Sequence, residues 1–172
     1  MCPKQNKEYY RIVKYIIEHP EFIKRKDYKH HENESVYEHS VKVSILSYKI
    51  AKFLHLDKES TAIGGLLHDF YYKPWQTNIG KKKFLKQHGF VHAKEALDNS
   101  SIYFNNFLNN KTEDIIARHM FPLNIKPPKY AESWIVTLVD KLVSLNILAH
   151  PTAWPKYVGI KTKIITGVKK DV

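Results

Sequence analysis

A histidine and an aspartate stand side by side among residues that are typical of a protein core. The stretch GGLLHDFYYK (residues 64–73) places His68 and Asp69 directly after two leucines and before Phe70. Burying a carboxylate is costly unless the group is paired or bound to a cation. Histidine and aspartate are also good ligands for a divalent metal ion. The doublet therefore indicates a metal site, provided that other parts of the chain supply further ligands.

Polar residues on apolar helix faces are the candidates for those further ligands. His39 shares a helix face with Val36 and Val43, because residues three and four apart lie on the same side of a helix. Asp140 follows Val136 by four residues and is placed in the same way. An aspartate on an apolar helix face requires a cationic partner. Two more histidines stand beside apolar residues of expected helices: His92 and His119.

Each of these residues also has a purely structural interpretation. A single histidine on an apolar face more often bonds to the backbone than binds a metal, which favours a core role for His92 and His119 taken singly. A single aspartate there more often pairs with a buried arginine or lysine. Taken together, however, six such residues would need six independent explanations. One metal centre accounts for all of them, because helices packed around a core can bring their side chains to one point.

The elements that must position these residues are predicted to be helices. Apolar residues recur at helical spacing, and no convincing run of strict alternation appears. Ser35 and Glu38 form a capping-box pattern that predicts the start of a helix. The stretch 71–89 is basic and aromatic, contains proline and glycine, and is expected to be mostly loop. The expected helices cover residues 8–18, 35–54, 58–70, 91–99, 112–119 and 130–149. The sequence therefore predicts an all-α fold, a compact bundle of about six helices around a metal site.

Length and composition favour one globular domain. The chain has 172 residues, and 43% of them are hydrophobic. Cys2 is the single cysteine, so no internal disulfide forms, which fits a reducing compartment. No apolar stretch is long enough for a signal peptide or for crossing a bilayer. We therefore expect a cytoplasmic protein that does not contact a membrane.

The charge of the chain favours an anionic ligand. The formal net charge is +11, from 28 lysines and arginines against 17 aspartates and glutamates. Such an excess attracts phosphorylated metabolites, nucleotides or nucleic acid. A solvated lysine-rich surface explains most of the lysines equally well.

The order of the polar residues resembles the HD-domain superfamily of metal-dependent phosphohydrolases. VYEHSV (residues 36–41) resembles the helix of the first histidine, GLLHD (65–69) the signature doublet, and VTLVDK (136–141) the helix of the last aspartate. The resemblance covers about residues 35–145. It implies a single all-α domain of HD type over residues 1–172, with residues 150–172 as a peripheral basic C-terminal segment.

The two histidines between the doublet and the last aspartate resemble the bimetallic branch of that superfamily. This branch includes phosphodiesterases of cyclic dinucleotides and hydrolases of dinucleoside polyphosphates. The resemblance implies two divalent transition metal ions, and a ligand set without cysteine suits Fe, Mn, Zn or Co. One ion would be held by His39, His68, Asp69 and Asp140. The second would be held by His92 and His119, with Asp69 as a bridge.

The resemblance implies hydrolysis of a phosphoester or phosphoanhydride by a metal-activated hydroxide, with a small phosphorylated molecule, a nucleotide, as the expected substrate. Asp69 would orient the nucleophile as well as bind metal. Lys73 and Arg118 are the candidates for phosphate binding, with Lys141 least favoured. Arg118 and Lys141 each stand next to a candidate ligand in the sequence. Adjacent helix positions point about 100° apart, so the alternative is that these two side chains face away from the metal ions. Lys73 lies one residue further from its doublet than the lysine of the HD-GYP phosphodiesterases, and the Gly-Tyr-Pro signature is missing, which argues against cyclic di-GMP.

Two other functions stay open on the sequence alone. A few HD-type proteins are di-iron oxygenases, which oxygen-dependent turnover would reveal. A non-catalytic domain that binds nucleotides or nucleic acid is the other alternative, and the complete set of ligands disfavours it. The sequence selects neither one substrate, nor one metal, nor an oligomeric state.

Overall fold

The computed structural model describes residues 6–31, 34–72 and 81–145, and the fold is all-α apart from one short strand pair. The helices are α1 (Lys7–Ile17), α2 (Pro20–Ile23), α3 (Val36–Phe53), α4 (Lys58–Leu67), α5 (Lys81–Phe104), α6 (Asn110–Arg118) and α7 (Ala131–Ser144). Short 3₁₀ helices cover Lys24–Asp27 and Asn105–Phe107. The antiparallel strands are β1 (Lys29–His31) and β2 (Glu34–Ser35). The predicted fold class is thus confirmed.

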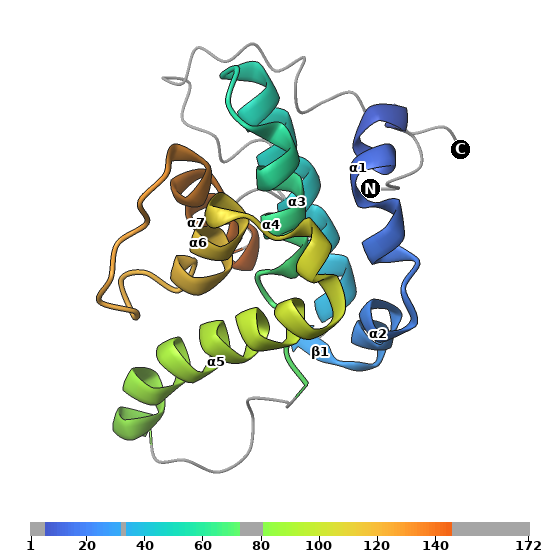
Figure 1. The fold of residues 1–172 in the computed structure, drawn as a ribbon. Coiled ribbons are helices and arrows are strands. Elements are labelled where there is room, and N and C mark those ends of the chain that lie inside the picture. Colours follow the sequence, from blue (N-terminus) through green and yellow to red (C-terminus); the bar gives the residue numbers. More distant parts are fainter. Residues whose placement is uncertain (1–5, 32–33, 73–80, 146–172) are drawn as a thin grey trace.

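Helices α3 and α4 form the centre of the molecule. Figure 1 shows α1 and α2 on one side of this pair, α6 and α7 on the other, and α5 running across one end. Helix α3 packs against α4 and α7, and α4 packs against α6. The predicted capping box starts α3: Ser35 Oγ accepts from Glu38 N at 3.2 Å, and Glu38 Oε2 accepts from Ser35 N at 3.0 Å.

Two adjacent glycines let α4 approach both of its neighbours closely. A Cβ atom at Gly64 would lie 2.7 Å from Ile115 Cδ1 on α6. A Cβ atom at Gly65 would lie 3.0 Å from the Cα of Ser44 on α3. The absence of side chains here brings the end of α4, where the histidine–aspartate doublet begins, between α3 and α6.

The hydrophobic core has two parts. The larger part joins α1 to α4 and includes Tyr9, Phe22, Leu66 and Phe70. The smaller part lies between α3, α6 and α7, close to the predicted metal ligands of these helices. Its members are Val43, Ile115, Val136, Val139 and Val143. Val43 and Val136 are two of the valines whose spacing predicted the apolar faces of α3 and α7.

The structure corrects several predicted boundaries. The expected loop over residues 71–89 is wrong at its C-terminal end, because α5 begins at Lys81 and continues to Phe104. Residues 81–104 are rich in helix formers, and one internal glycine costs only about 1 kcal/mol. Helix α4 ends at Leu67 rather than near residue 70, so His68 is its C-cap. Helix α2 and the strand pair were not predicted.

Some predictions fall outside the described residues. They concern residues 73–80, the end of the last helix after residue 145, and the peripheral segment 150–172. Within the described part of the chain, no helix combines the length and the apolarity needed to span a bilayer.

Candidate metal centre

The six predicted metal ligands meet in one cluster. Helix α3 contributes His39, α5 contributes His92 and α7 contributes Asp140, while His68 and His119 are the C-caps of α4 and α6. Their ligand atoms form two triads, and within each triad these atoms lie within 4.8 Å of one another. The first triad is His39, His68 and Asp140, and the second is Asp69, His92 and His119.

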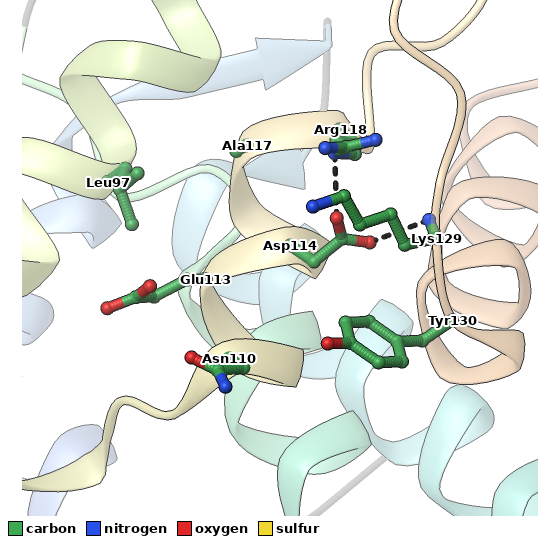
Figure 2. Close-up of a pocket in the computed structure, with 8 residues that line it drawn as sticks. All are labelled: Leu97, Asn110, Glu113, Asp114, Ala117, Arg118, Lys129 and Tyr130. Carbon is green, nitrogen blue, oxygen red and sulfur yellow. Dashed lines mark hydrogen bonds and ion pairs between the residues drawn. The ribbon is translucent and has the colours of Figure 1, made fainter.

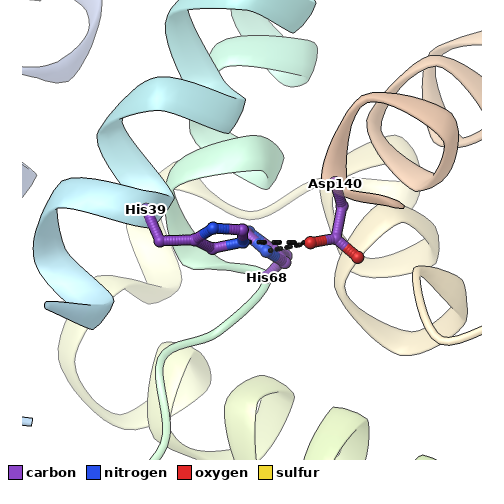
Figure 3. Close-up of side chains that lie close together, drawn as sticks. All are labelled: His39, His68 and Asp140. Carbon is purple, nitrogen blue, oxygen red and sulfur yellow. Dashed lines mark hydrogen bonds and ion pairs between the residues drawn. The ribbon is translucent and has the colours of Figure 1, made fainter. Parts of the chain in front are cut away.

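The first triad is arranged around one carboxylate oxygen. Asp140 Oδ1 lies 3.0 Å from His39 Nε2 and 3.6 Å from His68 Nε2. Figure 3 shows the two imidazoles directed at Asp140 from the opposite side. Both histidine side chains are fully buried, whereas that of Asp140 is 14% exposed. Solvent therefore reaches this triad from the side of α7.

The second triad is arranged around Asp69 Oδ1. This oxygen lies 2.6 Å from His92 Nε2 and 3.5 Å from His119 Nε2. All three residues are buried. A carboxylate with two imidazoles is a donor set that suits a divalent transition metal.

Asp69 also faces the first triad with its other oxygen. Asp69 Oδ2 lies 3.5 Å from His68 Nε2 and 3.9 Å from His39 Nε2. The two oxygens of one carboxylate are thus turned toward different triads. This is the orientation that the predicted bridging role requires.

Backbone contacts fix which ring nitrogen of two histidines faces the cluster. Nδ1 of His68 lies 2.8 Å from the carbonyl oxygen of Gly65, and Nδ1 of His119 lies 2.8 Å from that of Ile116. A carbonyl only accepts, so each Nδ1 carries a proton and donates it, leaving Nε2 as the ligand atom. Both Nε2 atoms are buried without a hydrogen-bond partner. Buried polar atoms are normally satisfied, and a metal ion would satisfy these two, so the residues fit the metal centre that the resemblance implies.

The electrostatics of the cluster favour positive charge. Burial lowers the pKa of His68, but the negative charges of Asp69 and Asp140 outweigh it and raise this pKa to about 9. Burial raises the pKa of Asp140, but the hydrogen bond from His39 and the nearby His68 imidazole bring it well below its ordinary value. Burial dominates at His119 and lowers its pKa. Two carboxylates thus hold a proton on His68, and a bound metal ion would replace that proton.

One face of α5 holds the backbone that follows the doublet. Glu95 Oε1 accepts from Tyr72 N at 3.0 Å, and Asn99 Nδ2 donates to the carbonyl of Phe70 at 3.0 Å. Both lie on the same helix face as His92, three and seven residues after it. The sequence analysis missed these two residues, although their spacing from His92 was visible.

A buried arginine holds the same backbone from the other side. Arg25 is fully buried, and its Nη1 donates to the carbonyl of Tyr71. Its guanidinium carbon lies 4.6 Å from the ring centroid of Tyr28 and 4.3 Å from that of Tyr72. The ring of Tyr71 in turn packs on His92, with 4.3 Å between ring centroids. No sequence signal distinguished Arg25 from the other basic residues.

Arg118, one of the predicted phosphate-binding residues, is not part of the cluster. Arg118 Nε lies 2.7 Å from Asp114 Oδ1, and its Nη1 donates to the carbonyl of Pro127 at 2.6 Å. This pair lines a pocket of about 430 Å³, together with Tyr130 and other residues (Figure 2). The described contacts of Arg118 therefore hold the chain between α6 and α7. Lys73 lies outside the described residues.

Comparison with known proteins identifies the family of the chain. A model of the HD domain matches residues 36–145, which is more than half of the sequence and spans all six cluster residues. The search of curated proteins and the search of solved structures found no match. The matched residues begin with the helix of His39 and end just after that of Asp140. On this match the chain belongs to the HD-domain family.

Proposed function

We propose that this protein hydrolyses a phosphoester or phosphoanhydride bond of a nucleotide with the help of two divalent metal ions. HD domains are typically metal-dependent phosphohydrolases. The observation that carries the proposal further is the position of Asp69, whose two oxygens face two different triads of potential ligands. A single-metal site would need only the first triad and Asp69, and would leave the arrangement of His92 and His119 unexplained.

The proposed roles of the residues follow from their positions. His39, His68 and Asp140 would hold one ion, His92 and His119 would hold the other, and Asp69 would contribute to both. Bound metal ions supply Lewis-acid activation of water and of the phosphate group. Asp69 accepts a hydrogen bond from the attacking water and so orients it toward phosphorus.

The substrate class is proposed from charge. The net charge of +11 attracts polyanions, whereas the cluster itself is negatively charged before metal binds. Lys73, four residues after Asp69, is the proposed phosphate-binding residue. Arg118 is the second candidate, and it would have to exchange its ion pair with Asp114 for the phosphate.

Metal content is the first measurement that tests the proposal. The chain is purified without chelator under low oxygen, and metal per chain is determined by elemental mass spectrometry. We expect a ratio near two in the parent, falling toward one in His92→Ala and in His119→Ala. His55→Asn is the matched control, because His55 is exposed and lies outside the cluster, and its metal content should equal that of the parent.

Turnover is the second measurement. Nucleotide phosphoesters and polyphosphates are screened for phosphate release, with His39→Ala and Asp69→Ala as inactive references. Turnover that depends on oxygen would contradict the proposal and identify an oxygenase. Nucleotide binding that persists in both variants, without turnover in the parent, would identify a non-catalytic domain.

A ratio of metal to chain near one that His92→Ala leaves unchanged would contradict the paired metal centre.

A further inference from the structure

Lys141 connects the helices that carry ligands of the two triads. It follows Asp140 on α7, and its Nζ donates to the carbonyl oxygen of His119 at 3.1 Å. A second, longer hydrogen bond of 3.4 Å joins Nζ to the carbonyl of Thr137 within the same helix. We infer that Lys141 is a positioning residue that holds His119 in place relative to Asp140. This inference rests on the proposed metal-binding role of the cluster.

The contact completes the C-terminal end of α6. The last carbonyl groups of a helix have no partner within it and need donors from elsewhere. Those of residues 115–118 accept hydrogen bonds from donors within residues 119–124. The carbonyl of His119 comes next, and its donor is provided by α7 instead. A cation is also favoured at a helix C-terminus, where the helix dipole is negative.

The partners of the Lys141 ammonium group are unusual, because they are backbone carbonyls rather than a carboxylate. A half-buried ammonium group ordinarily pairs with a carboxylate. The adjacent carboxylate is that of Asp140, but its Oδ1 faces His39 and His68. The described hydrogen bonds of Lys141 Nζ go to two backbone carbonyls. One of the two belongs to a predicted metal ligand, so the lysine acts on that ligand through its backbone.

His119 is thereby held at two points. Its ring is fixed by the hydrogen bond from Nδ1 to Ile116, and its backbone is fixed by Lys141. With both in place, Nε2 lies 3.5 Å from Asp69 Oδ1. Metal ligands must be held within about 0.5 Å of the productive geometry, and the loss of a supporting hydrogen bond typically weakens metal binding about 10–100-fold.

The test is metal binding by the full chain, stripped of metal and titrated with Mn²⁺ or Zn²⁺ in a calorimeter. Lys141→Met keeps the aliphatic stem and removes the donor. We expect one of the two sites to bind about 10–100-fold more weakly, and the other to change little. The weakened site should be the one that His119→Ala abolishes. Lys141→Arg, which keeps a donor, should restore most of the affinity, and Lys126→Met, at an exposed lysine beyond α6, should leave both sites unchanged.

A double variant separates positioning from a direct role. If Lys141 acts through His119, then Lys141→Met has no further effect on the remaining site in the His119→Ala background. Should Lys141→Met prevent folding, as judged by circular dichroism, Lys141→Gln replaces it, because its neutral amide group still donates but reaches less far than the ammonium.

Three results would overturn the inference in distinct ways. Unchanged metal binding with a raised KM for the phosphorylated substrate would make Lys141 a substrate-binding residue. An equal loss at both sites would make its role a general structural one. A parent chain that binds no metal would remove the proposed function itself, and this is seen before any lysine variant is measured.

Discussion

Nε2 of His92 lies 2.6 Å from Oδ1 of Asp69, although the two residues come from different elements and 23 positions separate them in the chain. This contact brings α5 to the doublet at the end of α4. The other oxygen of Asp69 is then left facing His68 and His39. The identity of both carboxylate oxygens should therefore matter for metal binding.

Replacing one of those oxygens should separate the two sites. In Asp69→Asn the side chain keeps its shape but offers one weak acceptor in place of two charged ones. We expect metal per chain to fall from near two to one or below, and phosphate release to fall by at least about 100-fold, as for loss of an acid–base group. Elemental analysis and a phosphate assay measure both. Asp98→Asn, at an exposed position of α5, serves as control, and two metals retained in Asp69→Asn would refute the bridging role.

Adding a methyl group at Gly64 should force α4 and α6 apart. The new Cβ would lie 2.7 Å from Cδ1 and 2.9 Å from Cβ of Ile115. Overpacking of this kind outweighs the gain in helix propensity, so we expect Gly64→Ala to lower the free energy of unfolding by roughly 1–2 kcal/mol. Urea denaturation measures this. The same change in an Ile115→Ala background should cost less, and strictly additive effects would show that the two residues do not clash.

Exchanging the buried Arg25 for lysine should destabilise the fold even though the charge is kept. Lysine cannot stack a planar group between Tyr28 and Tyr72 while donating to the carbonyl of Tyr71. Loss of desolvated cation–π contacts predicts a cost of roughly 2 kcal/mol in Arg25→Lys. Denaturant titration compares this variant with Lys24→Arg at the exposed neighbouring position. Equal stabilities of Arg25→Lys and the parent would refute the prediction.

The exposed ion pairs of Glu8 with Lys52 and Lys58 should make the free energy of unfolding depend on pH. Hydrogen bonds from Lys52 and Lys58 lower the pKa of Glu8 from its ordinary value of 4.5 to about 2. Because the folded-state pKa is depressed, the stabilisation is complete above pH 4.5 and is lost as the pH falls toward 2. Denaturation at stepped pH should show that Glu8→Gln is less stable than the parent at pH 6 and that the difference vanishes near pH 2. High salt should reduce the difference at pH 6, because exposed charges are screened.

The candidate ligands could be found in the sequence because they break local patterns. His39 and Asp140 interrupt apolar stripes, and His68 and Asp69 follow a helix whose glycines and leucines mark it as buried. Polar residues that interrupt an apolar pattern can be recognised within a single helix. The division of the candidate ligands between two metal ions came from the family resemblance, since no local pattern gives the distance between helices.

The supporting residues were not predictable in the same way, because their partners are distant in sequence. Asn99 looks like an ordinary helix residue until the carbonyl of Phe70, 29 positions earlier, is placed beside it. Arg118 is the reverse case: it adjoins His119 in sequence, yet its guanidinium is paired with Asp114. The start of α5 was missed because glycines were given more weight than the helix formers around them.

The position of His68 and His119 at the C-caps of α4 and α6 has a consequence for the order in which metal and substrate bind. The C-terminus of a helix carries a partial charge of roughly −0.5, and here two such ends converge beside two carboxylates. A phosphate group approaching the metal-free protein would be repelled by this local field despite the basic surface. We therefore expect compulsory ordered binding, in which the cations enter first and invert the sign of the site, so that nucleotide affinity in the metal-stripped protein is low and is restored by metal alone.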